Sequence, residues 1–395
     1  MTALHGNSPE KRSAVILFIR IGPYHAARLR EAAPALREAG YSPIVIEIYR
    51  KDATYEWDRV EADPTYSRHT LFDDQSESRS WRQIYRSVTQ RLDQLTPSVV
   101  IIPGWANAPA LSALHWCRKR NRPSVLLSES TAQDYRRQPW TEWIKSLLIK
   151  RFDAALVGGT AQRAYLENLG FPAAHIYDGY NVVDNQYFST ASDRSRTMTE
   201  KRRLSLPDDY FLSVSRLLPR KNISGLLRAY KEYVTRSSDS PWGLVICGDG
   251  PERDALINQA TQLGLDNIQW PGFVQIDTLP SYYAHASAFI IPTSGAEPWG
   301  LVVNEAMACG LPILASTRAG CQHDLISTPD NGYCFDPDKP EELAEQMIRL
   351  HALPESERNA MGEESRSIIA KWDPTRFARG LVAAVSTATG ALHNE

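Results

Sequence analysis

The stretch from Ile291 to Ser316, IPTSGAEPWGLVVNEAMACGLPILAS, constrains the fold of this chain more than any other part of it. An apolar run at residues 288–291 breaks at a proline, and a short loop leads to a predicted helix that begins near Gly300 and ends with Gly310 as a left-handed cap. A second apolar run follows. Strand, loop, helix and strand in this order form one unit of a parallel α/β sheet, in which ligands bind at the carboxyl ends of the strands. The loop before the helix is therefore predicted to face a binding crevice.

Two carboxylates flank the start of this predicted helix, Glu297 on the loop and Glu305 inside the helix. Between them, the free N–H groups of Gly300, Leu301 and Val302 and the positive end of the helix dipole suit a phosphate. A carboxylate within the helix can accept hydrogen bonds from two neighbouring hydroxyls, as a ribose presents them. Each glutamate alone also has an ordinary explanation, one as a stabiliser of its own helix N-terminus and the other as a solvated side chain.

The combination Glu-x7-Glu within this stretch resembles the signature of retaining glycosyltransferases of family four, which use nucleotide sugars and have the GT-B fold. The resemblance implies that Glu297 contacts the donor sugar and that Glu305 contacts the nucleotide ribose. It implies a nucleoside-diphosphate sugar as donor, a glycan, a glycolipid or a small molecule as acceptor, and no cofactor. It also implies an α/β fold of two facing, Rossmann-like, doubly wound domains with the active cleft between them.

Two cations lie after the first predicted strand of the second domain, in YFLSVSRLLPRKN. Arg216 ends this strand, Lys221 follows five residues later, and Asn222 is a predicted helix N-cap. An arginine fork and a lysine point charge at one strand end are suited to hold a diphosphate. Surface basicity would also explain two cations, but Arg-x4-Lys at this position matches the family, which implies that both stabilise the departing diphosphate during catalysis.

Three further segments of the second half are similar to the family. The strand end CGDG places Gly248 and Gly250 before a helix, and the resembled loop passes near the base and ribose. In IQWPGFV, main-chain groups around Phe273 and Val274 would meet the base. In AGCQHDLI, Asp324 stands where the family has a glutamate.

The pair Asp336 and Asp338 is predicted to form a turn before a helix and not a metal site, because no histidine or third carboxylate lies nearby in the sequence.

The first half of the chain alternates apolar runs of strand length with helical stretches, which predicts a doubly wound parallel sheet. Predicted strands lie at residues 14–21, 43–48, 98–102, 124–128 and 154–157, and predicted helices at 25–40, 81–95, 109–120 and 161–169. Residues 50–77 are predicted to form a polar loop.

Four residues of this half are candidates for the acceptor side of the cleft. Gly22 and His25 lie in the turn after the first strand, where the family often has a Gly-Gly pair; His25 is also explained as a cap or surface residue. Glu129 ends a strand where family members often place a histidine, and a solvated loop carboxylate is the alternative. Asn181 matches the family's segment on the hinge side of the cleft; an ordered turn is the alternative.

Residues 135–152, YRRQPWTEWIKSLLIKRF, predict an amphipathic helix. Its apolar side chains at 140, 143, 144, 147 and 148 share one face, and Arg136, Arg137, Lys145, Lys150 and Arg151 surround it. Two interpretations stay open. The apolar face packs on the sheet, or residues 136–151 make a peripheral contact with an anionic membrane, for which tryptophan with basic residues is the typical composition.

The predicted domains follow from these elements. Residues 1–190 form the acceptor-binding domain, completed by a C-terminal helix at 373–395, and residues 207–372 form the donor-binding domain. The polar, charged segment 191–206 between them lacks periodicity and is predicted to be a linker.

Composition sets limits on the partners and the compartment. A formal net charge of -2 argues against nucleic acid as a partner. The five cysteines show no Cys-x-x-Cys spacing, which is typical of reduced thiols in a cytoplasmic protein. No apolar run is long enough to span a membrane, and MTALHGNSPEKRS does not resemble a signal segment, so at most a peripheral location on the cytoplasmic face is expected.

The resemblance implies a metal-independent hexosyltransferase that retains the configuration of the anomeric carbon. A non-catalytic nucleotide-sugar-binding subunit is disfavoured because both glutamates and both cations are present. A nucleotide-sugar epimerase would need acid and base groups that we cannot locate at the sugar. A polysaccharide phosphorylase is disfavoured by the short chain and by the absence of a pyridoxal phosphate lysine motif.

Overall fold

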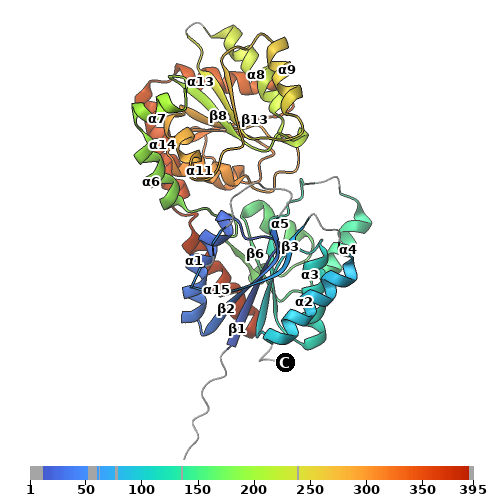
Figure 1. The fold of residues 1–395 in the computed structure, drawn as a ribbon. Helices are drawn as coiled ribbons and strands as arrows, with labels where there is room; N and C mark the ends of the chain where they lie inside the picture. The colour runs from blue at the N-terminus through green and yellow to red at the C-terminus, as the bar shows by residue number, and fades with distance from the viewer. Residues whose placement is uncertain are drawn as a thin grey trace, which may run out of the picture.

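A computed structural model describes residues 12–51, 60–61, 63–75, 79–134, 137–237 and 240–390. It contains two parallel β-sheets, each with helices on its faces, stacked one above the other with the chain passing between them (Figure 1). The predicted α/β fold of two Rossmann-like domains is confirmed.

The N-terminal sheet has seven parallel strands in the order β3-β2-β1-β4-β5-β6-β7. Strand β1, inside this sheet, pairs with β2 on one side, where Ala14 lies opposite Pro43, and with β4 on the other, where Ala14 lies opposite Val99. The strands are β1 (Arg12–Phe18), β2 (Tyr41–Lys51), β3 (Ser67–Asp74), β4 (Val99–Pro103), β5 (Ser124–Ser128), β6 (Ala154–Val157) and β7 (Ile176–Asp178). The helices of this half are α1 (Pro23–Glu38), α2 (Trp81–Leu95), α3 (Ala108–Arg120), α4 (Pro139–Ile149), α5 (Thr160–Asn168) and the 3-10 turn η1 (Ala173–His175).

The C-terminal sheet has six parallel strands in the order β10-β9-β8-β11-β12-β13. The strands are β8 (Tyr210–Val214), β9 (Gly243–Cys247), β10 (Ile268–Gly272), β11 (Ala288–Ile291), β12 (Ile313–Ser316) and β13 (Gly332–Phe335). The helices around it are α6 (Asn185–Ser195), α7 (Met198–Arg203), η2 (Pro219–Lys221), α8 (Ile223–Arg236), α9 (Arg253–Gln262), α10 (Leu279–His285), α11 (Leu301–Ala308), α12 (Gln322–Leu325), α13 (Pro340–Ala352) and α14 (Glu355–Ile369). The last helix, α15 (Pro374–Gly390), returns to the first sheet and packs along α1 (Figure 1).

The predicted linker at residues 191–206 is wrong. Most of this segment is helical, as the end of α6 and as α7, and these helices pack against α10 and α11 of the C-terminal sheet. Phe188 on α6 is buried against Tyr283 with their rings edge to face, at a centroid distance of 6.3 Å. One apolar side chain buried against the second domain therefore fixes a helix whose exposed face is polar enough to look like a linker.

Two strands were not predicted. β3 lies inside the segment expected to be a loop, and β7 lies just before Asn181, where the sequence analysis expected no strand. Both are edge strands of the first sheet. β3 is partly exposed along its length and β7 has three residues, so neither produces the long apolar run that marks a central parallel strand.

A buried carboxylate fixes the turn between β1 and α1. Glu47 is fully buried, pairs with Arg68 at 2.6 Å, and accepts a hydrogen bond from the Ile21 N–H at 3.0 Å. A buried charge is stable only when it is paired and hydrogen-bonded, so this arrangement holds the turn in one position at the edge of the cleft.

The two domains share an apolar core that continues from one sheet to the other through Val183, Phe188 and Trp299. In the part of the chain that the structure describes, no helix combines the length and the apolar character needed to cross a lipid bilayer.

Candidate active site

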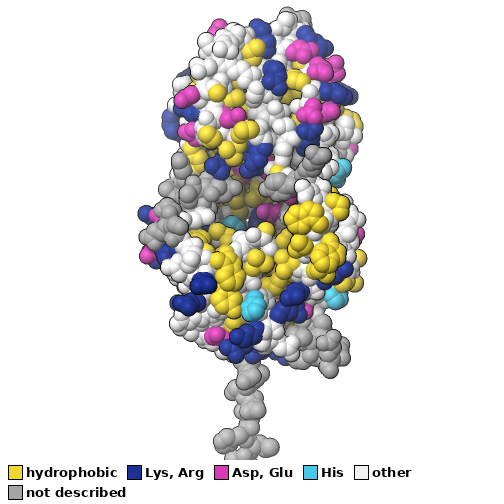
Figure 2. Space-filling view, turned by 90° about the vertical axis from the view of Figure 1, so that its right-hand side faces the viewer, with side chains coloured by type: hydrophobic (Ala, Val, Ile, Leu, Met, Phe, Trp, Pro, Cys, Tyr) yellow, Lys and Arg dark blue, Asp and Glu magenta, His cyan; other side chains and the backbone are white. Residues whose placement is uncertain are grey.

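A cavity of about 390 Å³ lies between the two domains, at the carboxyl ends of the strands. Figure 2 shows a hollow between the two domains. Ten of the predicted site residues line the cavity: Glu129, Arg216, Lys221, Gly248, Phe273, Val274, Glu297, Gly300, Leu301 and Val302. Five do not line it: Gly22, His25, Asn181, Gly250 and Glu305.

Lys221 and Glu297, two catalytic candidates of opposite charge, touch each other. Lys221 Nζ donates to Glu297 Oε2, and both side chains are largely buried. Arg220, which the sequence analysis did not single out, lies 4.0 Å from the same oxygen and donates to the Ala296 carbonyl at 2.9 Å. The backbone carbonyl of Arg220 also accepts from Ser294 N–H. The loop that presents Glu297 is thus built on the turn that carries the two cations.

The start of α11 opens onto the cavity. Gly300 is its N-cap with φ 101°, a left-handed conformation that favours glycine, and an added Cβ would lie 2.7 Å from Ile291. The first N–H groups of any helix lack carbonyl partners within the helix, and those of Leu301 and Val302 belong to this first turn. Together with the helix dipole they provide an anion site next to Lys221.

Glu305 lies beneath this helix start and is fully buried. Tyr24 from α1 of the other domain donates to its Oε1, and Tyr283 donates to its Oε2 at 2.7 Å. Burial raises the pKa of Glu305 to about 7, although both hydrogen bonds act in the opposite direction. The ribose contact implied for this carboxylate would therefore exchange with a tyrosine hydroxyl.

The two glycines after β9 bring two loops together. Gly248 has φ 146°, and a Cβ there would lie 1.8 Å from the Ser215 carbonyl oxygen; a Cβ at Gly250 would lie 2.5 Å from that of Leu217. Gly248 lines the cavity, whereas Gly250 is not part of its lining. The glycines are required for this close approach of two backbones.

Glu129 faces the donor half of the site from the end of β5. Its carboxylate is exposed to the cavity but enclosed by the walls of the cleft, and this burial raises its pKa. Glu297 across the cavity raises the pKa further, while the cation of Arg28 opposes the shift. Arg28 is buried on α1, where its Nε donates to the Val182 carbonyl at 3.1 Å.

Gly22 and His25 form the N-terminal cap of α1. The Gly22 N–H donates to His25 Nδ1 at 3.2 Å, and the His25 ring lies against Phe18 with centroids 4.5 Å apart. Burial lowers the pKa of His25 to about 3, so the ring is neutral and Nε2 carries its proton. Gly22 itself has an ordinary φ of -99°, and a Cβ there would lie in ordinary contact with His25 Nδ1 at 3.9 Å.

Asn181 does not line the cavity, contrary to the prediction. It is fully buried at the seam between the domains, where its carbonyl accepts from Asn304 Nδ2 at 3.2 Å. Its side chain packs against Gly158, where a Cβ would lie 2.5 Å from the amide nitrogen. At this seam the C-terminal domain packs directly on the loop that contains Asn181, so the loop is covered.

Asp324 joins the two domains. It accepts from the Thr160 N–H at 3.1 Å and from the Thr160 hydroxyl at 2.6 Å, so it caps helix α5 of the N-terminal domain from α12 of the other. Beside it, Gln162 donates to the Pro298 carbonyl. A Cβ on Gly159 would collide with Asp324 and Trp299, at 2.5 and 2.8 Å. A side chain at residue 159 would separate the two domains.

The Asp336 side chain accepts from the Asp338 N–H at 3.0 Å, which is the turn expected from the sequence, and Asp338 pairs with Arg318. Within the described ranges, no three His, Cys, Asp or Glu side chains are grouped so that they could hold a metal ion.

The sequence analysis missed the residues whose role depends on the other domain. No local sequence motif marks these residues, which are Tyr24 and Arg28 on α1, Tyr283 on α10, and Arg220 beside Lys221. Arg28 lies among apolar residues of the predicted helix at 25–40, and this was the one available signal, because a buried arginine needs partners.

Residues 195–368 match the family described as glycosyl transferases group 1. The match covers 174 of the 395 residues. The matched region contains both glutamates and both cations of the site, so the family resemblance predicted for this part of the chain is confirmed.

Curated relatives match part of the chain. An uncharacterised glycosyltransferase of Methanocaldococcus jannaschii is 33% identical over 174 residues, which is 43% of this chain and 43% of that protein. The GDP-mannose-dependent monoacylated alpha-(1-6)-phosphatidylinositol monomannoside mannosyltransferase of Corynebacterium glutamicum is 30% identical over 199 residues, 48% of this chain and 50% of that protein. The chain thus spans about half the length of these relatives.

Solved structures match both domains. Anabaena HepE in complex with UDP and glucose has a TM-score of 0.73 at 17% identity and covers 95% of this chain and 100% of its own. A glycosyltransferase of Rickettsia africae has a TM-score of 0.72 at 14% identity, covering 97% and 100%. The chain has the GT-B fold.

Proposed function

We propose that the protein is a retaining glycosyltransferase that moves a hexose from a nucleoside-diphosphate sugar to a hydroxyl of a glycan or lipid-linked glycan. The observation that carries the proposal is the convergence of Lys221, Arg216, Glu297 and the first turn of α11 on one cavity between two GT-B domains. The match of residues 195–368 to the glycosyl transferases group 1 family supports it.

In the proposed reaction the bond between the anomeric carbon and the β-phosphate oxygen breaks, and its electron pair stays on the phosphate. The acceptor oxygen forms the new bond to the anomeric carbon on the same face, and its proton passes to the departing phosphate. Negative charge on the diphosphate grows next to Lys221, Arg216 and the N–H groups of α11. Donors already aimed at this charge stabilise the transition state without a metal ion, and each typically contributes about 3 kcal/mol.

The carboxylates have different tasks in this proposal. Glu297 orients the donor sugar and balances positive charge on its ring, and the Lys221 cation pairs with it. Glu305 holds the ribose. Glu129 lies on the acceptor side, where its raised pKa suits a group that hydrogen-bonds an acceptor hydroxyl.

Fewer features of the chain support the proposed acceptor than support the proposed donor. The Corynebacterium relative acts, by its name, on a phosphatidylinositol mannoside, which is a lipid-linked sugar. Such an acceptor requires contact with a membrane, and residues 136–151 are the part of this chain proposed to make it; Arg136 lies outside the described residues. The proposed location is the cytoplasmic face of the membrane, where cysteines stay reduced.

The test is a panel of uridine, guanosine and adenosine diphosphate sugars, measured for binding and for slow hydrolysis in EDTA. Hydrolysis of one donor, lost in Lys221→Ala and in Glu305→Gln, would support the proposal and identify the donor. Binding without hydrolysis would indicate a non-catalytic subunit, and conversion of the donor sugar without acceptor would indicate an epimerase. No binding of any donor would contradict the proposal.

A further inference from the structure

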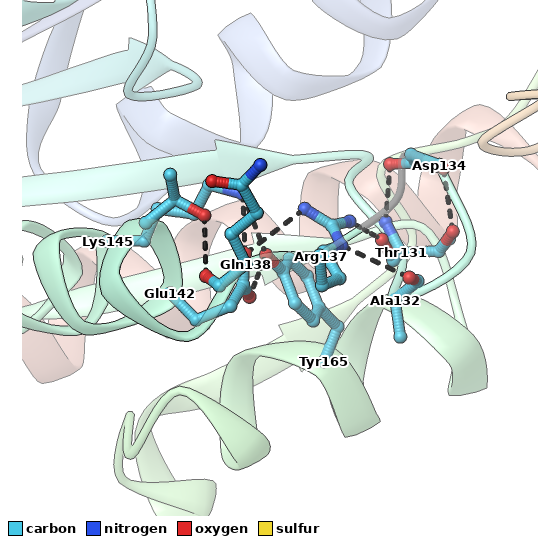
Figure 3. A network of polar contacts seen from close by, with 9 residues as sticks. Thr131, Ala132, Asp134, Arg137, Gln138, Glu142, Lys145 and Tyr165 are labelled. Atoms are coloured by element: carbon cyan, nitrogen blue, oxygen red, sulfur yellow. Dashed lines mark hydrogen bonds and ion pairs between the residues drawn. The ribbon is translucent and has the colours of Figure 1, made fainter.

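Helix α4 has its polar face turned inward. Glu142 accepts from the Tyr165 hydroxyl of α5 at 2.7 Å and from Lys145 Nζ at 2.8 Å (Figure 3). Arg137, just before the helix, lies over the Tyr165 ring at 4.4 Å and donates to the Ala132 carbonyl at 3.1 Å. These contacts fix the rotation of α4 on the domain.

The opposite face of α4 is therefore held toward solvent, although it is apolar. Trp140, Trp143, Ile144 and Leu147 are exposed by 62, 64, 48 and 51%. They lie at helical spacing on one side, and we call them the α4 face. The interpretation that the whole apolar stripe packs on the sheet is wrong, because only the inner end of the helix, at Leu148 and Ile149, joins the core.

The exposure of the apolar side of α4 has an energetic cost. Four large apolar side chains in water are unfavourable by the area that they expose, at about 25 cal/mol per Å². The polar network of Glu142 and Tyr165 prevents the helix from rotating to bury them. A contiguous apolar patch that is held exposed marks an interaction surface.

The charge around the α4 face identifies the partner. Helices α2, α3 and α4 carry seven Lys or Arg against two Asp or Glu, a net charge of +5, whereas the whole chain has -2. Lys150 and Arg151, directly after α4, are both exposed. Figure 2 shows hydrophobic side chains gathered on this side of the N-terminal domain with basic side chains at their margin, beside the hollow between the domains.

A second copy of the chain does not fit this surface. In a two-fold dimer the same patch meets itself, so three helices with net positive charge would face their own copy. Exposed tryptophans within a basic surround match instead the interface of an anionic bilayer, where the indole rings lie at headgroup level and the cations attract acidic lipids.

We propose that the α4 face docks the protein on an anionic lipid bilayer. Trp140 and Trp143 enter the headgroup region, and Lys150 and Arg151 contact acidic headgroups. The helix lies on the membrane as a fixed part of the domain, because its inner face is bound to α5.

The position of α4 connects this surface to the site. The segment before it, through Thr131, Gln133 and Asp134, lines a second, open cavity of about 1010 Å³, whose other wall includes Glu297. A headgroup-linked acceptor could pass from the bilayer along this cavity to the donor sugar. The docking stands without the transferase activity, and only the lipid-linked acceptor rests on the proposed function.

Vesicle flotation tests the docking in the absence of donor. The protein is expected to float with phosphatidylcholine vesicles that contain phosphatidylglycerol, and not with phosphatidylcholine alone, at about 0.1 M salt. The double variant Trp140→Ser and Trp143→Ser should lose at least about tenfold in partition coefficient. Lys150→Gln and Arg151→Gln should each lose about fivefold, as expected for one cation at an anionic surface. Met198→Ser removes a side chain of similar exposure, 58%, from α7 on the other domain and should change nothing.

Three results would overturn the proposal. One is equal flotation of the tryptophan variant and the parent with an unchanged thermal unfolding curve. Another is binding that does not depend on acidic lipid. The third is dimerisation in sedimentation velocity without lipid that the tryptophan variant abolishes, which would make the α4 face a contact between copies. Donor hydrolysis by the same variant separates the two proposals, because it should persist when flotation is lost.

Discussion

The Tyr24 hydroxyl, on the first helix of the N-terminal domain, donates a hydrogen bond to Glu305 in helix α11 of the C-terminal domain. The carboxylate proposed to hold the donor ribose thus accepts a hydrogen bond from the opposite domain. Glu305 Oε1 cannot accept a full-strength hydrogen bond from Tyr24 and another from a ribose hydroxyl at the same time. Donor binding and the contact between the domains are therefore linked at this one atom.

Stability should depend on pH through Glu305. Its pKa is raised by burial from 4.5 to about 7, so between these pH values the folded protein binds more protons than the unfolded chain. The free energy of unfolding therefore falls as the pH rises through this range, by up to about 3 kcal/mol. Glu305→Gln should remove the effect and melt at a higher temperature than the parent at pH 8, with similar melting at pH 5. Thermal unfolding at both pH values measures this; a parent curve that does not fall between them would contradict it.

Nucleotide affinity should rise over the same range. Glu305 accepts ribose hydroxyls best when it is ionised, and the ionised fraction increases about tenfold from pH 6 to pH 8 for a pKa of about 7. Calorimetric titration with the nucleoside diphosphate of the preferred donor should show about tenfold tighter binding at pH 8. The diphosphate also titrates, so Glu305→Gln is the control: its affinity should be weaker and should change less with pH.

The two neighbouring cations should differ in their effect on the rate. Lys221 is 15% exposed and touches Glu297, whereas Arg220 is 41% exposed and lies 4.0 Å from it. Lys221→Met should lower kcat on the order of 100-fold, because it removes a desolvated charge from the site of the leaving diphosphate. Arg220→Met should lower it by less than about tenfold, since solvent screens its charge. Transfer rates at saturating donor compare them, and equal losses would show that Lys221 has no special position.

Removal of Asp324 should loosen the contact between the domains. Its carboxylate caps α5 through the Thr160 N–H and hydroxyl, and loss of such a cap costs about 1 kcal/mol. Asp324→Ala should therefore lower the melting temperature by about 1 °C, while Asp266→Ala, an exposed carboxylate, should not. Limited proteolysis between the domains should also become faster. If both variants melt like the parent, the capping contact does not stabilise the closed arrangement.

The donor half of the site could be predicted from the sequence because its geometry is local. The strand, loop and helix around Glu297 and Glu305 occupy consecutive residues, and the loop ends that carry Lys221 and Gly248 follow directly from their strands. Tyr24 could not be predicted, because its contact with Glu305 joins residues that are 281 positions apart.

The first domain shows a second limit. Helical spacing identifies the apolar side of α4 but not the direction that it faces, which depends on the bond between Glu142 and Tyr165 of another helix. The linker prediction failed for a related reason: Phe188 is the one buried apolar side chain of α6, on an otherwise polar segment.

The path of the chain gives the molecule one more property. It leaves the N-terminal domain before α6 and comes back before α15, and at this double crossing Asn185 Nδ2 donates to the carbonyls of Ile369 and Trp372 at 2.8 and 3.2 Å. The two connecting segments are thereby tied together, so any opening of the cleft would be a rotation about two connected segments and not a swing on a single one. The donor domain is inserted into the acceptor domain, and a single cut between them would leave the N-terminal sheet without α15. Separate expression of the acceptor domain requires a chain in which residue 183 is joined directly to residue 373.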